Sequence, residues 1–128
     1  MKRVVQFTAL AVLVASSGAY ADGDADKGKK LFARCSACHA TGDQNKVGPG
    51  LQNVVGRSAG AVAGYNYSPA LKTSGLTWDE ATLDAFLKAP QSIVKGTRMS
   101  LSLPKDQDRA DVIAYLATLA DTPVPLPK

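Results

Sequence analysis

Two segments near the ends of the chain carry apolar or small residues three and four positions apart, the spacing of one face of an α-helix. The stripe within residues 24–35 consists of Gly28, Leu31, Phe32 and Cys35. The stripe within residues 106–120 consists of Val112, Tyr115, Leu116 and Leu119. In the second segment Asp106 is a good N-cap, and Asp108 suits the positive end of a helix. The pattern therefore predicts an amphipathic helix over each segment.

A third helix is predicted over residues 77–89. Thr77 and Glu80 have the spacing of a capping box, and Pro90 cannot continue the helix. The expected apolar face consists of Ala81, Phe86 and Leu87, with Leu83 beside them.

The segment from Ala40 to Trp78 differs from the rest, because it holds seven of the eleven glycines. Only a short helix, beginning near Ser68 and Pro69, is predicted there. An irregular stretch of this length is uncommon in a compact domain unless it is functional. We therefore expect this segment to wrap a cofactor.

Residues 1–21 have the pattern of a signal peptide: Lys2 and Arg3 precede an apolar run that ends at Ala15, and cleavage is expected after Ala21. The run is shorter than the roughly 20 apolar residues of a membrane span. An uncleaved anchor is the alternative, but we expect no stable membrane insertion. The pattern predicts export to the periplasm.

The remaining chain is expected to form one domain over residues 22–120, followed by a mobile, proline-rich tail over residues 121–128. The signal peptide holds two of the fifteen basic residues and none of the eleven acidic ones, so the mature net charge is +2. Such a weak positive charge gives little support to nucleic-acid binding, and we expect no nucleic-acid partner.

Cys35, Cys38 and His39 form a Cys-x-x-Cys-His motif that contains both cysteines and the single histidine of the chain. This motif is typical of c-type haem attachment. The two thiols bond to the porphyrin vinyl groups, and the imidazole binds the iron.

Three other interpretations of the motif have less support. A dithiol exchange site favours a βαβ context, with the first cysteine at a helix N-terminus. A structural zinc site needs four ligands, and the chain offers three. An ordinary disulfide remains open, although it leaves His39 and the glycine-rich segment without a purpose.

Met99 is the single methionine left after signal-peptide removal. It lies in a polar, irregular stretch, where a methionine that merely fills a core would be out of place. We favour Met99 as the second axial ligand of the iron, with packing or an open iron site as alternatives.

The chain resembles class I cytochromes c, namely mitochondrial cytochrome c and its soluble bacterial relatives. The resemblance extends from Gly23 to about Ala120. Its landmarks are Gly-Lys-Lys-Leu-Phe at 28–32, Cys-x-x-Cys-His, Val-Gly-Pro-Gly-Leu at 47–51, Gly-Arg at 56–57, Tyr-Asn-Tyr at 65–67, Gly-Leu-Thr-Trp at 75–78, Gly-Thr-Arg-Met at 96–99 and Asp-Val-Ile-Ala-Tyr-Leu at 111–116. It implies an all-α cytochrome c fold, with three to five short helices and long loops wrapped around one covalent haem c.

The resemblance also implies residue functions. Pro49 offers its carbonyl to the Nδ1 proton of His39. The residues that match haem-propionate contacts are Arg57, Tyr67, Trp78 and Thr97. For Arg57 a solvated surface charge is the alternative. Gly28 and Phe32 match the crossing of the terminal helices.

Three positions depart from the mitochondrial pattern. Phe86 replaces a tyrosine whose hydroxyl approaches the methionine sulfur, so that hydrogen bond should be absent. Leu71 replaces an asparagine near an internal water, and Leu101 replaces an aromatic residue near the haem edge. The fine tuning of the reduction potential in mitochondrial cytochromes c therefore cannot be transferred to this chain.

The predicted function is one-electron transfer by a soluble, monomeric protein with His39 and Met99 on the iron. Redox partners with acidic docking surfaces, such as a cytochrome complex, oxidase or dehydrogenase, would meet a basic collar. Its candidate members are Lys30, Lys46, Lys88, Lys95 and Arg98. The sequence contains no set of catalytic acid, base or nucleophile residues that would support an independent enzyme. A haem sensor that loses Met99, or a bound dehydrogenase subunit, remains an alternative.

Overall fold

The computed structural model describes residues 22–121, so the predicted signal peptide and nearly all of the predicted tail lie outside the described residues. The elements are α1 (Ala25–Leu31), the 3-10 helix η1 (Phe32–Arg34), α2 (Pro69–Lys72), α3 (Glu80–Lys88), α4 (Pro90–Ile93) and α5 (Asp106–Ala117). Within residues 22–121 there is no β-strand, and the one isolated bridge joins Ser58 to Thr77. The all-α prediction is confirmed.

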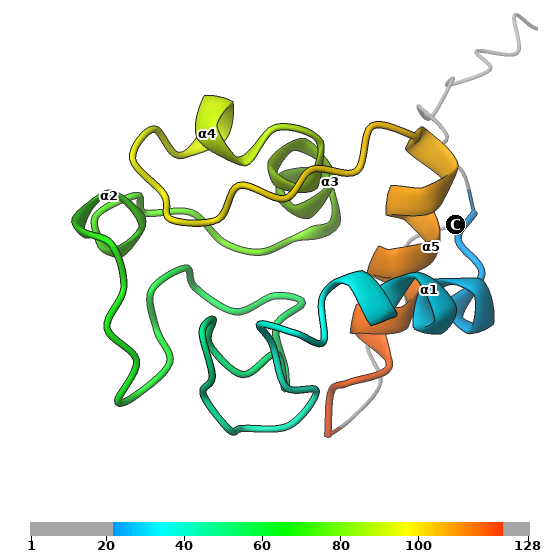
Figure 1. Ribbon diagram of the computed structural model, residues 1–128, viewed down its shortest axis with the longest axis horizontal. Coiled ribbons are helices and arrows are strands. Elements are labelled where there is room, and N and C mark those ends of the chain that lie inside the picture. Colours follow the sequence, from blue (N-terminus) through cyan, green and yellow to red (C-terminus); the bar gives the residue numbers. More distant parts are fainter. Residues whose placement is uncertain (1–21, 122–128) are drawn as a thin grey trace, which may run out of the picture.

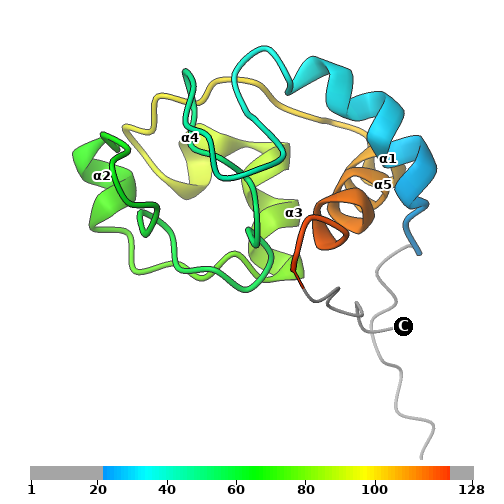
Figure 2. The same ribbon diagram turned by 90° about the horizontal axis from the view of Figure 1, so that it is seen from below.

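The first and last helices cross beside each other, as both ribbon views show (Figures 1 and 2). Gly28 lies at the crossing, where a Cβ atom would stand 1.9 Å from the main-chain oxygen of Asp111. Next to it, the rings of Phe32 and Tyr115 meet edge to face with 5.4 Å between their centroids. The missing side chain of Gly28 therefore permits the close approach of α1 and α5.

Helix α5 differs from its prediction at both ends. Its N-cap is Lys105 rather than Asp106, and it ends at Ala117 rather than at residue 120. The carboxylate of Asp106 pairs with the buried guanidinium of Arg109 and so is not used as a cap. The Arg109 guanidinium also donates to Asp84 of α3 at 2.8 Å, which ties the two helices together.

Helix α3 begins three residues later than predicted, so the Thr77 capping box is wrong. Thr77 is paired with Ser58, and the Trp78 amide donates to the Arg57 carbonyl at 2.8 Å. The N-cap is Asp79, whose carboxylate accepts a 2.8 Å hydrogen bond from the Thr82 amide. The extended pairing takes up the backbone that the first helical turn would need.

The buried face of α3 also differs in part from its prediction. Ala81 is exposed, while Leu83 belongs to the core with Phe86 and Leu87. The helix stops before Pro90 as predicted, but Pro90 then begins α4, which the sequence pattern did not predict.

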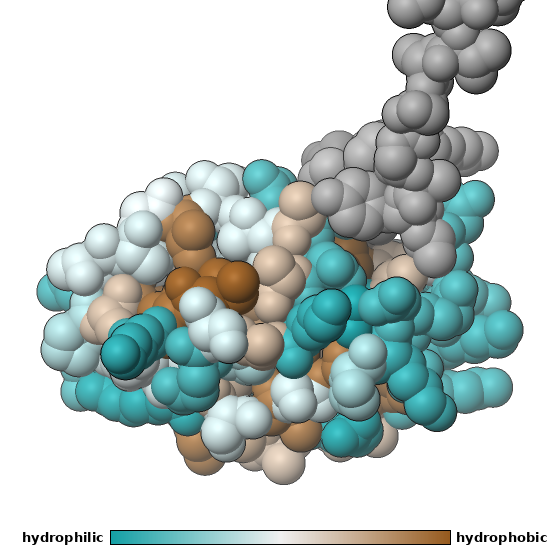
Figure 3. All heavy atoms as spheres, turned by 90° about the horizontal axis from the view of Figure 1, so that it is seen from above, coloured by the Kyte–Doolittle hydropathy of each residue, from teal (hydrophilic) through white to brown (hydrophobic). Residues whose placement is uncertain are grey.

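The long segment between η1 and α3 contains only α2, which begins after Ser68 as predicted. In Figure 1 its loops run along the side of the molecule away from the N-terminal half of α5. The surface seen in Figure 3 is mostly hydrophilic, with apolar side chains gathered near its middle. Among the described residues, none of the helices has the length and apolar character to cross a membrane.

Candidate haem-binding site

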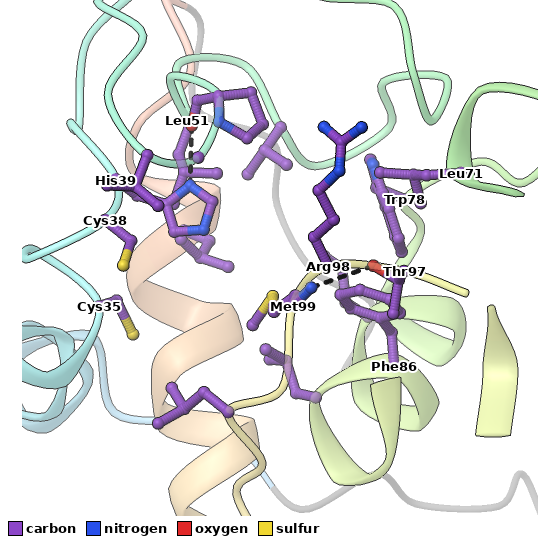
Figure 4. A pocket seen from close by; sticks show the side chains of 18 of the residues that line it. Cys35, Cys38, His39, Leu51, Leu71, Trp78, Phe86, Thr97, Arg98 and Met99 are labelled. Carbon is purple, nitrogen blue, oxygen red and sulfur yellow. Dashed lines mark hydrogen bonds between the residues drawn. The ribbon is translucent and has the colours of Figure 1, made fainter. Parts of the chain in front are cut away.

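The described residues enclose a mostly apolar cavity of ≈ 390 Å³ between the helices and the glycine-rich loops (Figure 4). All nine residues that the sequence singled out line it: Cys35, Cys38, His39, Pro49, Arg57, Tyr67, Trp78, Thr97 and Met99. They come from six separate stretches of the chain. The fold thus brings together residues that are up to 64 positions apart.

The cysteines and His39 sit on a single tight turn after η1. The amides of Cys38 and His39 both donate to the carbonyl of Cys35, at 3.0 and 2.9 Å. This turn places all three side chains at the cavity, as Figure 4 shows. Both cysteines are free thiols, which argues against the disulfide alternative. Burial raises the pKa of the Cys35 thiol, against a smaller lowering by Arg34.

The imidazole of His39 is held from two sides. Its Nδ1 lies 2.8 Å from the carbonyl oxygen of Pro49, and this acceptor requires a proton on Nδ1. Gly48 packs against the ring so closely that a Cβ atom there would stand 2.4 Å from Cε1. Burial is the main cause that lowers the pKa of His39, although the Pro49 carbonyl acts in the opposite direction. The neutral ring therefore presents the lone pair of Nε2 as a ligand.

Met99 enters the same cavity from the loop that follows α4 (Figure 4). Its amide donates to Thr97 Oγ1 at 3.4 Å, and its side chain is half-buried. A neutral nitrogen and a thioether sulfur from two distant segments are a donor set typical of low-spin haem iron in electron carriers.

Arg57 provides positive charge at the cavity wall. Its Nη1 and Nη2 donate to the carbonyls of Gln52 and Gly50, at 2.7 and 3.1 Å. Its Nε is buried without a hydrogen-bond partner, and no carboxylate of residues 22–121 forms an ion pair with it. Burial lowers the pKa of Arg57, against a smaller opposite effect of Tyr67. A half-buried cation with a free donor fits a ligand that carries carboxylates.

Comparison with known proteins points to one family. The family model described as Cytochrome c matches residues 25–120. The chain is 55% identical over 111 residues to "Cytochrome c2" of Rhodomicrobium vannielii, which covers 84% of this chain and 89% of that protein. It is 43% identical to "Cytochrome c" of Euglena viridis, covering 77% of this chain and 100% of that one.

The chain belongs to the cytochrome c family. The solved structure of cytochrome cH from Methylobacterium extorquens superposes with a TM-score of 0.72, at 48% identity, covering 75% of this chain and 99% of that chain. As a class I cytochrome c, the protein carries one covalent haem c and transfers electrons; it is not an enzyme. The predicted fold, cofactor and function class are confirmed.

The residues of this cytochrome fit that cofactor. The free thiols, the imidazole oriented by Pro49 and the unpartnered Arg57 Nε meet the chemical requirements of a covalently bound porphyrin with carboxylates. The remaining propionate candidates are buried: Tyr67, Trp78 and Thr97. The Tyr67 hydroxyl accepts a 3.0 Å hydrogen bond from the Val62 amide and keeps its own proton to donate.

The three departures from the mitochondrial pattern all line the cavity as aliphatic or aromatic hydrocarbon: Leu71, Phe86 and Leu101. Phe86 packs on Trp78 with ring centroids 4.8 Å apart. It has no hydroxyl to offer to the Met99 sulfur, as the sequence predicted.

Sequence reasoning missed two contributors to the site. Arg34 is exposed and also lines the cavity. Its position directly before Cys35 could have indicated from the sequence that it lies at the site. The close packing of Gly48 against His39 had no separate signal, because Gly48 also suits the turn beside Pro49.

Proposed function

We propose that this cytochrome c works as an exported electron shuttle whose haem iron is bound by His39 Nε2 and Met99 Sδ, with Cys35 and Cys38 as the covalent anchors. The observation that carries the proposal is the convergence of these four side chains on one cavity (Figure 4). When bound, the haem supplies the one-electron Fe(II)/Fe(III) chemistry.

The protein's contribution is to hold ligands and exclude water. The Pro49 carbonyl fixes the orientation of His39 and makes its Nε2 more electron-rich. The apolar wall, including Trp78 and Phe86, disfavours the extra positive charge of the oxidised state and raises the reduction potential. With His39 and Met99 both bound, the iron would have no open position for oxygen or peroxide, and electron transfer would need little movement of these two side chains.

We also assign the haem propionates to the polar wall of the cavity. Arg57 Nε, the Tyr67 hydroxyl and the Trp78 and Thr97 side chains are the groups available there. A buried carboxylate requires hydrogen-bond donors of this kind and the positive charge of Arg57, because its desolvation is costly.

The ligand assignment is tested by optical spectra of the oxidised holoprotein. The native protein should show a sulfur-to-iron charge-transfer band that Met99→Ala abolishes. The reduction potential of the variant should fall by on the order of 100 mV, because the thioether favours ferrous iron. Leu101→Ala, which removes another side chain of the cavity wall, is the matched control and should keep the band.

Absence of the band from the native protein would refute Met99 ligation. Binding of carbon monoxide to the native reduced protein would instead favour the alternative of a haem sensor with an open iron site.

Docking of partners is assigned to the basic collar defined above, whose five members are all exposed. Arg98 lines the cavity itself, and Lys46 Nζ donates to the carbonyl of Ser36, beside the haem-binding cysteines, at 2.7 Å. These positions suit recognition of acidic redox proteins by a monomeric shuttle.

Export to the periplasm follows from the signal-peptide pattern of residues 1–21. The mass of the exported protein tests both processing and attachment. It should equal that of residues 22–128 plus one haem, and a mass that includes residues 1–21 would contradict cleavage.

A further inference from the structure

The side chain of Gln91, in α4, contacts the loop of residues 94–99 that follows this helix and is called the Met99 loop below. Its Nε2 donates to the carbonyl oxygens of Thr97, at 2.5 Å, and of Met99, at 3.3 Å. One amide nitrogen carries two protons and can serve two acceptors. Gln91 thus ties Thr97 and Met99, six and eight positions further along the chain, to the helix that precedes them.

The loop has few other attachments. The Thr97 amide donates to the Val94 carbonyl at 3.0 Å, across a turn in which Gly96 adopts a φ of 96°. The Arg98 guanidinium donates to the Asn66 carbonyl at 2.7 Å. Among the described residues, Gln91 is the only side chain outside the loop that hydrogen-bonds the main chain of Met99.

We propose that Gln91 is a positioning residue that holds the Met99 loop closed and so keeps the thioether on the iron. The inference rests on the Met99 ligation proposed above. A ligand on a loop is displaced through the fraction of molecules in which the loop is open. Removing bonds that exist only in the closed loop increases that fraction by a factor that grows exponentially with their free energy.

The amide, rather than the size of the side chain, carries this effect. Glutamate has the same shape but offers no donor to the two carbonyls at neutral pH, so Gln91→Glu should behave like Gln91→Ala. Gln107 provides a matched control in α5, because its Nε2 also donates to two acceptors, the Asp22 carbonyl and Asp111 Oδ1, at 3.1 and 2.9 Å. Gln107 does not line the cavity.

The experiment is an imidazole titration of the oxidised holoprotein at pH 7. The loss of the sulfur-to-iron band measures how much Met99 has been displaced. Imidazole competes with Met99 for the iron. The apparent dissociation constant should fall roughly fivefold to tenfold in Gln91→Ala and Gln91→Glu, and stay near the native value in Gln107→Ala. Guanidinium unfolding followed by far-ultraviolet circular dichroism records any general loss of stability in each variant.

The outcomes separate the two proposals. A native protein without the band refutes Met99 ligation itself. A native protein with the band, but with equal imidazole affinity in the Gln91 and Gln107 variants, refutes the positioning function of Gln91. A native-like Gln91→Glu would also refute it, because that result would show that side-chain size suffices.

Discussion

The orientation of His39 depends on two neighbouring residues that act in different ways. Pro49 supplies the acceptor for Nδ1 at 2.8 Å, and Gly48 supplies the space in which the ring lies. The hydrogen bond decides which nitrogen carries the proton, and the packing decides where the other nitrogen points. Both are short-range effects of the Val-Gly-Pro-Gly-Leu stretch.

Gly48→Ala tests the packing contribution. The new Cβ would overlap the imidazole, so the ring must move and the hydrogen bond to Pro49 must weaken. We expect the free energy of unfolding of the holoprotein to fall by about 1–3 kcal/mol. The reduction potential should rise, because a less basic imidazole stabilises ferric iron less.

Gly42→Ala is the matched control, because a Cβ at Gly42 meets nothing within 4 Å. Chemical denaturation and redox titration of both variants give the comparison. Identical midpoints and potentials in the two proteins would contradict the importance of the Gly48 contact.

At the scale of elements, the contact of α1 with α5 fixes the ends of the domain against each other. Asp24 caps α1 through its side chain, and its own amide donates to the buried carboxylate of Asp111 at 2.8 Å. The start of one helix is therefore bonded directly to the middle of the other. This arrangement requires the helix axes to come as close as Gly28 allows.

Gly28→Ala should therefore destabilise the protein, although the same change in an exposed helix is stabilising by roughly 0.5–1 kcal/mol. The Cβ would collide with the main chain of Asp111, which cannot rotate away. We expect a loss of about 1–3 kcal/mol in the free energy of unfolding. Lys29→Ala, at an exposed position of the same helix, should change it little. Guanidinium unfolding of the two holoproteins measures the difference, and a Gly28→Ala protein as stable as the native one would disprove the close contact.

For the whole molecule, the placement of charge matters more than its sum. The net charge of +2 expected after signal-peptide removal would produce little steering at a distance, whereas a lysine beside the turn of residues 35–39 acts locally on an approaching anion. Oxidation of the reduced protein by hexacyanoferrate(III), a small anionic oxidant, is a simple probe of this local field.

Lys46→Glu should slow this oxidation by on the order of threefold to tenfold at low salt, and added salt should reduce the difference. Lys105→Glu makes the same change in net charge at an exposed position before α5 that does not line the cavity, and it should have a smaller effect. Equal rates for the two variants, compared by stopped-flow absorbance, would mean that net charge rather than the collar controls the encounter.

How far the sequence predicts each feature depends on how local its cause is. The two terminal helices and the stop before Pro90 were predicted correctly, because periodicity and proline chemistry act within a few residues. The first helix was predicted too long: α1 ends at Leu31, and the chain continues as the 3-10 helix η1, so Phe32 and Cys35 of its stripe lie beyond α1, as Leu119 lies beyond α5. The start of α3 was predicted wrongly, because Thr77 pairs with Ser58, which lies nineteen positions earlier in the chain. The cap of α5 failed for a similar reason, since Asp106 is taken by Arg109.

The sequence by itself determined the chemistry: two thiols and an imidazole within five residues, and Met99 as the only thioether besides that of Met1. These are covalent and compositional facts that no folding can alter. Only the tertiary structure decided that Arg57 keeps an unpartnered donor in the cavity wall and that Gln91 reaches the carbonyl of Met99. Such contacts depend on how loops far apart in the chain pack around one cavity, and that packing is a property of the whole fold.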